Sequence, residues 1–220
     1  MKIMAPVDPA LLALSTDVVL FSIHAERLDV LLLKQAARQW QLPGGEVGAC
    51  EDLDGAALRH LREQTGVDDV YLEQLYTFGD PRRVDCQRVV SVAYYALVPA
   101  ERLPLDELRK NPQVDWCPVS DLPPLTLDHA QIVTLAHQRL ASKLAYSTIA
   151  LQFMPASFTL SALQTVYETI LGEVLDKRNF RKRILAMNCI ETTGGMAREG
   201  NHRPARLYRA THPGRIEFLK

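Results

Sequence analysis

The sequence has few cysteines and no long apolar run, and these two absences exclude several classes of protein. Four of its 220 residues are cysteine, widely separated and without a CxxC pair: Cys50, Cys86, Cys117 and Cys189. Disulfide-stabilised small proteins and cysteine-based zinc sites use closer spacings, so neither is expected. No apolar segment reaches the roughly 20 residues that a membrane-spanning helix needs, and no membrane partner is expected.

The amino terminus also lacks the marks of a secretion signal. The segment MKIMAPVDPALLALSTD contains a short apolar stretch, but it has no strongly basic start and no clear cleavage site. We interpret it as an arm or a short helix that precedes the first strand. Together with the expectation of reduced thiols, this favours a cytoplasmic protein.

The sequence does have an uneven distribution of charge. Its formal net charge is −1, but residues 146–220 carry 11 Lys and Arg against 6 Asp and Glu, whereas residues 1–145 carry 14 against 20. A change of sign along a chain suggests two functions, with the basic part facing a polyanion. We therefore predict two domains, residues 1–148 and 149–220, and expect the apolar junction Tyr146–Met154 to pack against one or both of them.

Hydrophobic patterns before residue 148 predict a sheet and a closing helix. Five segments rich in β-branched and aromatic residues are predicted to be strands: Asp17–Ile23, Leu28–Leu33, Leu72–Phe78, Val89–Val98 and Val114–Pro118. A helix is expected over Asp128–Ala145, where apolar residues recur at helical spacing. With the helix of the motif at residues 45–67, these elements favour an α/β/α sandwich with a mixed sheet.

The segment GEVGACEDLDGAALRHLREQTGV, residues 45–67, carries a specific motif. It follows Leu-Pro-Gly-Gly, and its fixed positions have the spacing of the Nudix box: Gly45, Glu51, Arg59, Glu63, Gly66 and Val67. The segment thus resembles the Nudix hydrolase superfamily, whose members cleave diphosphate compounds. Two positions depart from the box, because His60 and Gln64 stand where it has glutamates.

The two departures remove carboxylates from the helix of the motif. His60, Glu63 and Gln64 lie at i, i+3 and i+4, so we expect them to project together from one side of the helix. The opposite, apolar side is expected to face inward: Leu53, Ala57 and Leu61. Mg²⁺ and Mn²⁺ prefer several anionic oxygens, and diphosphate hydrolysis uses these metals to activate water. These three positions carry one negative charge in this chain, whereas they carry three in the Nudix box.

The motif therefore predicts binding of a diphosphate compound with little or no turnover. No catalytic residue and no required cofactor are expected. The only metal interaction for which the motif leaves room is weak Mg²⁺ binding at its degenerate positions: Glu51, Arg59, His60 and Gln64. A Nudix fold that is purely structural is the alternative interpretation, and metal-dependent turnover would favour an enzyme.

The last 70 residues predict a helix-turn-helix. A first helix is expected over Leu160–Leu171, capped by Thr159 or Ser157 and ended by Gly172. Asp176 suits the start of a second helix, whose inward side would hold Phe180, Ile184 and Met187. The other side of this helix is basic, and we assign its residues to DNA binding: Lys177, Arg178, Asn179, Arg181 and Lys182.

A β-hairpin after the second helix would complete a winged helix. Cys189–Thr193 is predicted to be a strand, Gly194–Arg203 a Gly-rich cationic tip, and Ala205–Arg209 the returning strand. The wing would present four residues to the phosphate backbone: Arg198, His202, Arg203 and Arg206. Basic helix faces are often merely solvated, and a winged helix can serve protein contacts, so both alternatives remain beside DNA binding.

The two parts together resemble the Nudix-related transcriptional regulators of NAD metabolism of the NrtR type. The resemblance covers nearly the whole chain. It rests on LPGG with the degraded box, on TFGDP followed by RVVSVAYYAL, and on three later runs: YSTIALQFMP, FTLSALQTVYETILGEVLDKRNFRKRI and RPARLYR. It implies a homodimeric repressor that binds a palindromic operator at genes of NAD synthesis or salvage. It also implies that ADP-ribose binds the Nudix domain and releases the DNA.

The resemblance also points to residues that would contact the effector. Related proteins often carry Arg-Asp-Pro-Arg after the TFG strand, whereas this chain reads RVDCQR at residues 83–88. Arginine suits phosphate geometry, and the predicted effector-binding residues are Arg82, Arg83, Arg88, Gly44, Gly45 and Glu63. Two further functions remain as alternatives: an ADP-ribose pyrophosphatase, and a Nudix-fused regulator that responds to a sugar.

Overall fold

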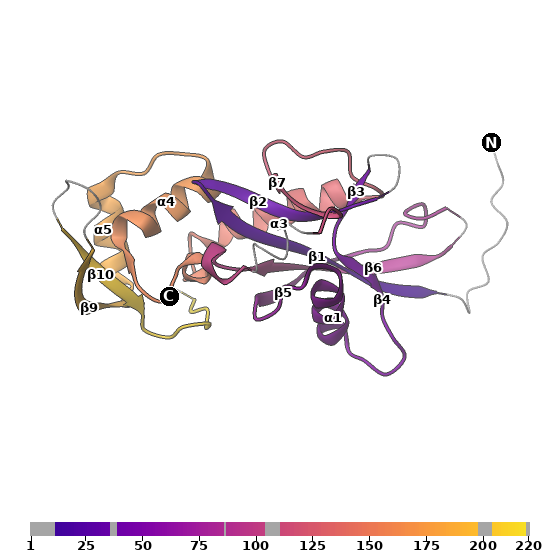
Figure 1. Cartoon of the computed structure of the whole chain (residues 1–220), viewed down its shortest axis with the longest axis horizontal. Helices are drawn as coiled ribbons and strands as arrows, with labels where there is room; N and C mark the ends of the chain where they lie inside the picture. Colours follow the sequence, from indigo (N-terminus) through magenta and orange to yellow (C-terminus); the bar gives the residue numbers. More distant parts are fainter. Residues whose placement is uncertain (1–11, 36–38, 86, 104–110, 198–203, 219–220) are drawn as a thin grey trace. The chain divides into compact units, whose positions relative to one another are not determined.

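The computed structural model describes residues 12–35, 39–85, 87–103, 111–197 and 204–218 (Figure 1). The chain divides into two compact units. The first comprises residues 1–21, 30–96 and 104–136, and the second comprises residues 22–29, 97–103 and 137–220. Because the chain enters the second unit three times, the single boundary after residue 148 stays a prediction.

A seven-stranded sheet contributes most of the first unit. Five strands lie in the order β3-β2-β1-β6-β5, while β4 pairs with β1 and β7 pairs with β2. All five predicted strands are present, and two short ones are added. The strands are β1 (Ala13–His24), β2 (Arg27–Lys34), β3 (Trp40–Gln41), β4 (Gly44–Glu46), β5 (Tyr71–Phe78), β6 (Val89–Leu97) and β7 (Val114–Pro118).

The core of the first unit lies at the centre of this sheet. Val18–Phe21 in β1 and Ala93–Leu97 in β6 are buried without interruption, so both faces of these strands are covered. Helix α1 (Leu53–Thr65) buries Ala57 and Leu61 as predicted, although Leu53 is only half-buried. Helix α3 (His129–Lys143) adds apolar residues from its first two turns: Ile132, Val133 and Ala136.

Helix α1 begins and ends at residues suited to both positions. The Asp52 side chain accepts a hydrogen bond from the Gly55 amide at 2.7 Å, which satisfies one of the free amides at the helix start. Gly66 follows the helix with φ of 72°, in the left-handed region that favours glycine. The motif therefore forms a loop, a helix and a tight exit, as its sequence predicts.

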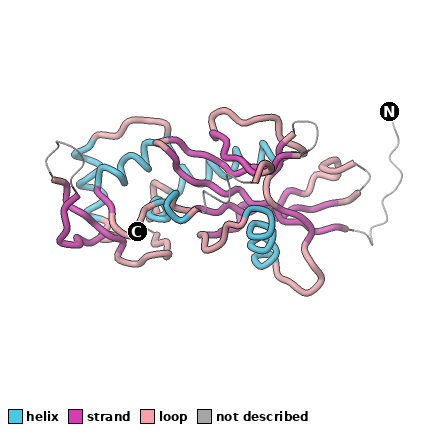
Figure 2. The backbone as a smooth tube through the Cα atoms, viewed as in Figure 1, coloured by secondary structure: helices cyan, strands magenta, loops and turns pink. Residues whose placement is uncertain are grey.

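The second unit contains the predicted helix-turn-helix and hairpin (Figure 2). A three-stranded sheet has the order β8-β10-β9. Two short 3₁₀ helices, η2 (Ala100–Arg102) and η3 (Ile149–Phe153), also belong to this unit. Its remaining elements are β8 (Phe158–Thr159), α4 (Leu160–Leu171), α5 (Lys177–Ala186), β9 (Ile190–Ala197) and β10 (Ala205–Ala210).

Capping and packing explain why α4 and α5 form where the sequence predicts them. Thr159, not Ser157, caps α4, and its hydroxyl accepts from the Ala162 amide at 3.1 Å. Asp176 caps α5, and its carboxylate accepts from the Asn179 amide at 2.8 Å. The helices meet through Tyr167 and Phe180, whose rings form an edge contact at 5.2 Å. The predicted inward residue Met187 instead ends α5 and is half-buried.

The apolar junction Tyr146–Met154 is folded rather than extended. Ile149, Ala150 and Phe153 of η3 are buried. The Thr148 amide donates to the Glu217 carbonyl at 3.0 Å, and the Glu217 amide donates to the Thr148 hydroxyl at 2.9 Å. The junction thus packs with the end of the described chain inside the second unit, which accounts for its apolar composition.

No helix in the described part of the chain combines the length and the apolar composition that a membrane crossing requires.

Replacing Asp176 with alanine should destabilise the second unit. The change removes the carboxylate that caps α5, and loss of such a cap costs about 1 kcal/mol of unfolding free energy. Denaturant unfolding of Asp176→Ala, compared with Glu173→Ala just before the helix, measures this cost. Equal stability of the two variants would show that the cap contributes nothing.

Candidate functional site

The three polar side chains that α1 is expected to present together differ in exposure. His60 is buried, Glu63 is exposed and Gln64 is half-buried. The Nε2 atom of His60 lies 2.9 Å from the Glu46 carbonyl oxygen, so this nitrogen carries the proton and donates. His60 therefore packs under the loop before the helix, and only Glu63 reaches solvent as expected.

Gln64 holds the same loop through both ends of its amide. The Gly44 amide donates to Gln64 Oε1 at 2.9 Å, and Gln64 Nε2 donates to the Gly44 carbonyl at 2.9 Å. A glutamate here could accept the first bond but could not donate the second when ionised. The departure from the Nudix box at this position thus stabilises the loop.

Gly44 and Gly45 are required by close packing. A Cβ atom on Gly44 would lie 2.2 Å from the Thr16 carbonyl oxygen, and one on Gly45 would lie 2.6 Å from Cε1 of His60. Any side chain at Gly44 would therefore collide with the backbone of β1. The sequence predicts that both glycines contact an effector, and the structure shows that close packing also favours glycine at each position.

Arg59 engages the two box carboxylates that remain. Its Nε and Nη2 atoms donate to Glu51 at 2.8 and 2.5 Å, and Nη1 donates to Glu63 at 3.3 Å. The hydrogen bond from Arg59, followed by that from the Gly48 amide, lowers the pKa of Glu51 to about 2. Glu51 is thus ionised at neutral pH, and its charge is already paired.

These residues do not fit the metal set of a working Nudix box. Glu51 and Glu63 are paired with Arg59, Gln64 holds Gly44, and His60 directs Nε2–H toward a carbonyl. Among the described residues, no group of three or more His, Cys, Asp or Glu is placed to hold a metal ion. The donors that Mg²⁺ prefers do not converge here.

Replacing Gln64 with glutamate should weaken the fold. The introduced carboxylate would face the Gly44 carbonyl without a proton to donate, and an unpaired partner of this kind costs about 1–3 kcal/mol. Repulsion raises the folded-state pKa of that carboxyl, so stability should recover as the pH falls through this value. Urea unfolding at pH 7 and pH 4 tests this, with Glu63→Gln on the exposed side of α1 as the control. An equal loss of unfolding free energy at pH 7 and at pH 4 would contradict this prediction.

Arg83 lies in a buried cluster of charges instead of facing an open site. Its side chain is 3% exposed, and Nη2 is 2.5 Å from Oδ2 of Asp17 in β1. Its Nε donates to Asp128, just before α3, at 2.9 Å. The Ser91 hydroxyl of β6 also donates to Asp17 Oδ2, at 2.6 Å. The guanidinium that was predicted to bind effector is thus held by two carboxylates.

His129 joins this cluster to the loop before the motif. Its Nδ1 accepts from the Leu42 amide at 3.0 Å, so the ring proton is on Nε2, which lies 3.5 Å from Asp17 Oδ1. Burial lowers the pKa of His129, which favours the neutral ring. Sequence reasoning did not identify this cluster, because its members come from four separate segments.

A cavity of about 500 Å³ opens beside the cluster. Arg82 stands at its edge with a side chain 84% exposed and pairs with Asp80 at 3.0 Å. Pairing with Arg82 lowers the pKa of Asp80 to about 2. Arg88, the third predicted arginine, is half-buried and donates to the Val89 carbonyl at 3.4 Å. The cavity is lined by Phe78, Gly79, Asp80, Arg82, Arg83, Leu127, Asp128 and Gln131.

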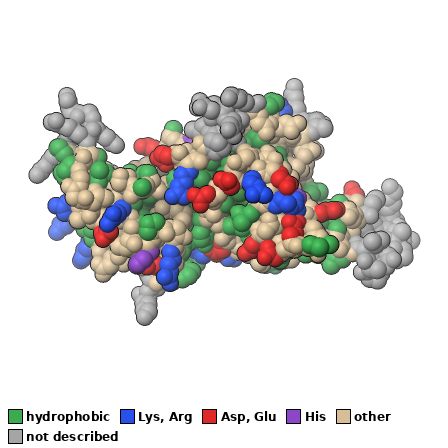
Figure 3. Space-filling view, turned by 60° about the horizontal axis from the view of Figure 1, so that its bottom comes forward, with side chains coloured by type: hydrophobic (Ala, Val, Ile, Leu, Met, Phe, Trp, Pro, Cys, Tyr) green, Lys and Arg blue, Asp and Glu red, His purple; other side chains and the backbone are tan. Residues whose placement is uncertain are grey.

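The second unit presents the basic surface that its sequence predicts. Figure 3 shows Lys and Arg side chains over this unit, and more Asp and Glu over the first. The residues assigned to α5 are all exposed: Lys177, Arg178, Asn179, Arg181 and Lys182. Arg206 on β10 is exposed as well. The predicted wing residues Arg198, His202 and Arg203 lie outside the described residues.

Two other arginines of this unit have structural partners. Arg183 donates to the Leu144 carbonyl at 2.7 Å and lies over the Tyr167 ring at 6.0 Å. Arg209 pairs with Glu191 at 2.8 Å. Arg183 and Arg209 are thus engaged by groups of the protein itself, whereas the residues assigned to DNA binding on α5 and β10 are exposed.

Both parts of the chain match known protein families. Residues 12–137 match the NUDIX domain, and residues 150–210 match the NrtR DNA-binding winged helix domain. The fold class is a mixed-sheet Nudix α/β domain followed by a C-terminal winged helix, as the sequence predicts. The chain belongs to the NrtR family of Nudix-related transcriptional regulators.

Individual proteins that are similar to this chain belong to the same family. The chain is 33% identical over 204 residues, 89% of its length and 81% of the relative's, to the ADPR responsive transcriptional repressor NtrR of Acinetobacter baylyi. It is similar to the crystal structure of Shewanella oneidensis NrtR complexed with a 27mer DNA, with a TM-score of 0.82 and 34% identity over 90% of this chain and 93% of that one. It is also similar to the NUDIX domain of Shewanella oneidensis NrtR complexed with ADP ribose, with a TM-score of 0.52 and 33% identity over 61% of this chain and 94% of that one.

Proposed function

We propose that this protein is a transcriptional repressor of NAD synthesis or salvage genes whose Nudix domain binds ADP-ribose and thereby releases operator DNA. The observation that carries the proposal is the outward basic surface of α5 and β10 in a chain similar to a regulator solved with DNA. A similar Nudix domain was solved with ADP ribose. The two ligands thus belong to separate parts of the chain.

The Nudix domain acts as a sensor and not as an enzyme. Hydrolysis of a diphosphate needs carboxylates free to hold a metal and to activate water. In this chain Arg59 pairs with Glu51 and Glu63, while Gln64 is bonded to Gly44. These contacts support binding of ADP-ribose with little or no turnover and without a required cofactor. They speak against the pyrophosphatase alternative.

The cavity beside the buried cluster is the proposed effector site. Arg82 stands at its edge, where release from Asp80 would let its guanidinium bind a diphosphate. Arg83 has a different role, because its charge is balanced by Asp17 and Asp128. It is a positioning residue that fixes the cavity wall. Arg88, Gly44, Gly45 and Glu63 remain proposed contributors to effector binding.

Release of DNA follows from a dimer that reads two half-sites. A homodimer places two recognition helices in successive major grooves, about 34–36 Å apart, so a palindromic operator fits its symmetry. An effector that changes the separation of the helices breaks this match. Residues 1–148 would form the sensing domain and residues 149–220 the DNA-binding domain of a cytoplasmic protein.

Linkage between the two ligands tests this mechanism. If ADP-ribose and operator oppose each other, each must weaken the other by the same factor. Titration calorimetry of ADP-ribose into the free protein and into the protein saturated with operator measures the first factor. Operator titration with and without ADP-ribose gives the second. Equal ADP-ribose affinity for free and operator-bound protein would show that the mechanism is wrong.

A further inference from the structure

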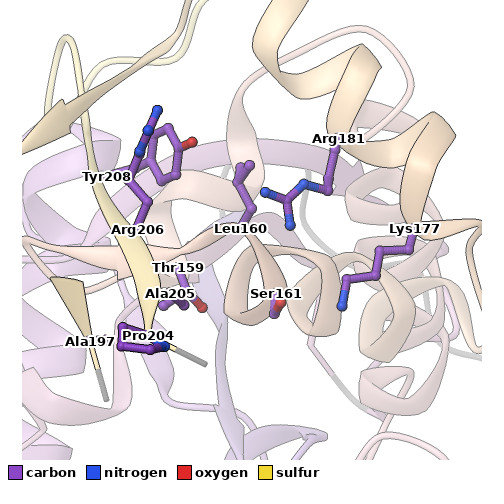
Figure 4. Close-up of a pocket in the computed structure, with 10 residues that line it drawn as sticks. All are labelled: Thr159, Leu160, Ser161, Lys177, Arg181, Ala197, Pro204, Ala205, Arg206 and Tyr208. Atoms are coloured by element: carbon purple, nitrogen blue, oxygen red, sulfur yellow. The ribbon is translucent and has the colours of Figure 1, made fainter. Parts of the chain in front are cut away.

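A cavity of about 620 Å³ lies within the winged helix, between three of its elements (Figure 4). The start of α4 forms one wall, α5 forms another, and β10 with the end of β9 forms the third. Among the described residues that line it, three are cationic and none carries a carboxylate: Thr159, Leu160, Ser161, Lys177, Arg181, Ala197, Pro204, Ala205, Arg206 and Tyr208. The lining therefore favours an anion.

The cations of this cavity have no partner within the described part of the protein. Lys177, Arg181 and Arg206 make no ion pair or side-chain hydrogen bond there, whereas Arg183 and Arg209 are both engaged. Lys177 and Arg181 lie at i and i+4 on α5, where like charges destabilise a helix. Figure 4 shows both side chains extending from α5 toward the start of α4. A bound anion would relieve their repulsion.

The start of α4 adds uncharged donors to the same cavity. The Thr159 hydroxyl accepts from the Ala162 amide, but the Ser161 amide belongs to the first turn, where amides have no partner within the helix. The Ser161 side chain is exposed and lies on the cavity wall opposite Lys177 in Figure 4. Hydroxyl and amide groups at a helix start suit a phosphate, and here they supplement the cationic side chains.

We propose that this cavity receives one phosphate of the DNA backbone, bound jointly by Lys177, Arg181 and the hydroxyl and amide of Ser161. Arg206 attracts the same strand from the opposite wall. The proposal rests on the proposed function, namely that this module binds DNA. It adds Ser161 to the DNA-contacting residues and makes Lys177 and Arg181 one phosphate contact instead of two. Such a contact fixes the position of α5 on the duplex but reads no sequence.

Substitution of Ser161 by aspartate separates phosphate binding from folding. A carboxylate in the first turn of α4 suits the positive end of the helix dipole, so the melting temperature should stay the same or rise. The same carboxylate would repel the phosphate and remove a hydroxyl donor. DNA affinity should therefore fall about tenfold or more, on operator and on unrelated duplex alike. The control is Ser157→Asp, which makes the same charge change outside this cavity.

Fluorescence anisotropy with labelled duplexes and thermal unfolding give the readouts. Equal DNA affinity of the Ser161→Asp and Ser157→Asp variants would overturn the proposal. A loss of affinity for the operator without a loss of affinity for unrelated duplex would also overturn the proposal, because it would indicate that Ser161 takes part in base recognition. If the unmodified protein binds neither duplex, the proposed function itself fails, and this outcome differs from both of the others.

The salt dependence of binding tests the shared phosphate. Each neutralised phosphate contributes about 0.9 to the slope of log affinity against log salt. The double substitution Lys177→Ala with Arg181→Ala should lower the slope by about 0.9, as for one phosphate, and each single variant should lower it by less. A fall of about 1.8 would mean two separate phosphates and would contradict the shared site. Arg178→Ala, on the same helix but outside the cavity, serves as the matched control, and its effect should add to that of Arg181→Ala.

Discussion

Replacing Asp17 with alanine is expected to lower the free energy of unfolding by about 3–5 kcal/mol. Asp17 accepts from Arg83 at 2.5 Å and from Ser91 at 2.6 Å, and it faces Nε2 of His129. Without this carboxylate the buried guanidinium would keep, among the described residues, only Asp128 as a charged partner. Truncating one member of a buried ion cluster leaves the opposite charge only partly compensated in a place that water does not reach.

Chemical denaturation of the Asp17→Ala variant measures this loss. The control is Asp80→Ala, which breaks the exposed pair with Arg82 and should cost less than about 1 kcal/mol. The same Asp17→Ala variant should bind ADP-ribose weakly even where it is folded, because Arg83 would no longer fix the cavity wall. If Asp17→Ala were as stable as Asp80→Ala, the cluster would not hold the first unit together.

The largest effect on DNA binding is expected from Arg181→Ala combined with Lys182→Ala. Both side chains are exposed on α5, and neither contributes to the buried contacts of Tyr167 and Phe180. Hydrogen bonds to charged groups are worth about 1.5–3 kcal/mol each, so operator affinity should fall about a hundredfold or more. Affinity for ADP-ribose should not change, because these residues lie outside the Nudix domain.

Operator titration and ADP-ribose calorimetry on the same preparation check both halves of this prediction. The matched control is Arg62→Ala combined with Arg215→Ala, which removes two exposed positive charges that do not belong to α5. Loss of operator binding in the control as well would mean that net charge, and not the surface of α5, determines affinity. Loss of ADP-ribose binding in the α5 variant would contradict the assignment of the two ligands to separate domains.

The sequence predicts the elements of this fold well, because local chemistry determines them. Alternating and continuous apolar runs placed the five main strands, and the capping residues Asp52, Thr159 and Asp176 mark the starts of three helices. Gly66 and Gly172 end two of these helices with φ values of 72° and 71°. Each signal involves residues a few positions apart, so no long-range information is needed.

The sites are less predictable, because they depend on contacts between distant segments. Arg83 pairs with Asp17 and Asp128, which lie 66 and 45 positions away in the sequence. The residues near Arg83 in the sequence do not indicate that these two carboxylates will neutralise its charge. Helical spacing correctly groups His60 with Gln64, but it cannot tell that the loop of Gly44 and Gly45 will cover them. Burial therefore changed the expected role of a charged residue and of a histidine.

In the proposed mechanism ADP-ribose acts as a signal and is not consumed. Fluorescence anisotropy of a labelled operator from the promoter of this protein's own gene tests it directly, with ADP-ribose added in the presence of Mg²⁺ and then recovered by chromatography. We predict that the protein binds the operator, that ADP-ribose releases it, and that the ADP-ribose is recovered intact. Operator binding that ADP-ribose does not change, or release that occurs only as ADP-ribose is cleaved, would contradict this mechanism.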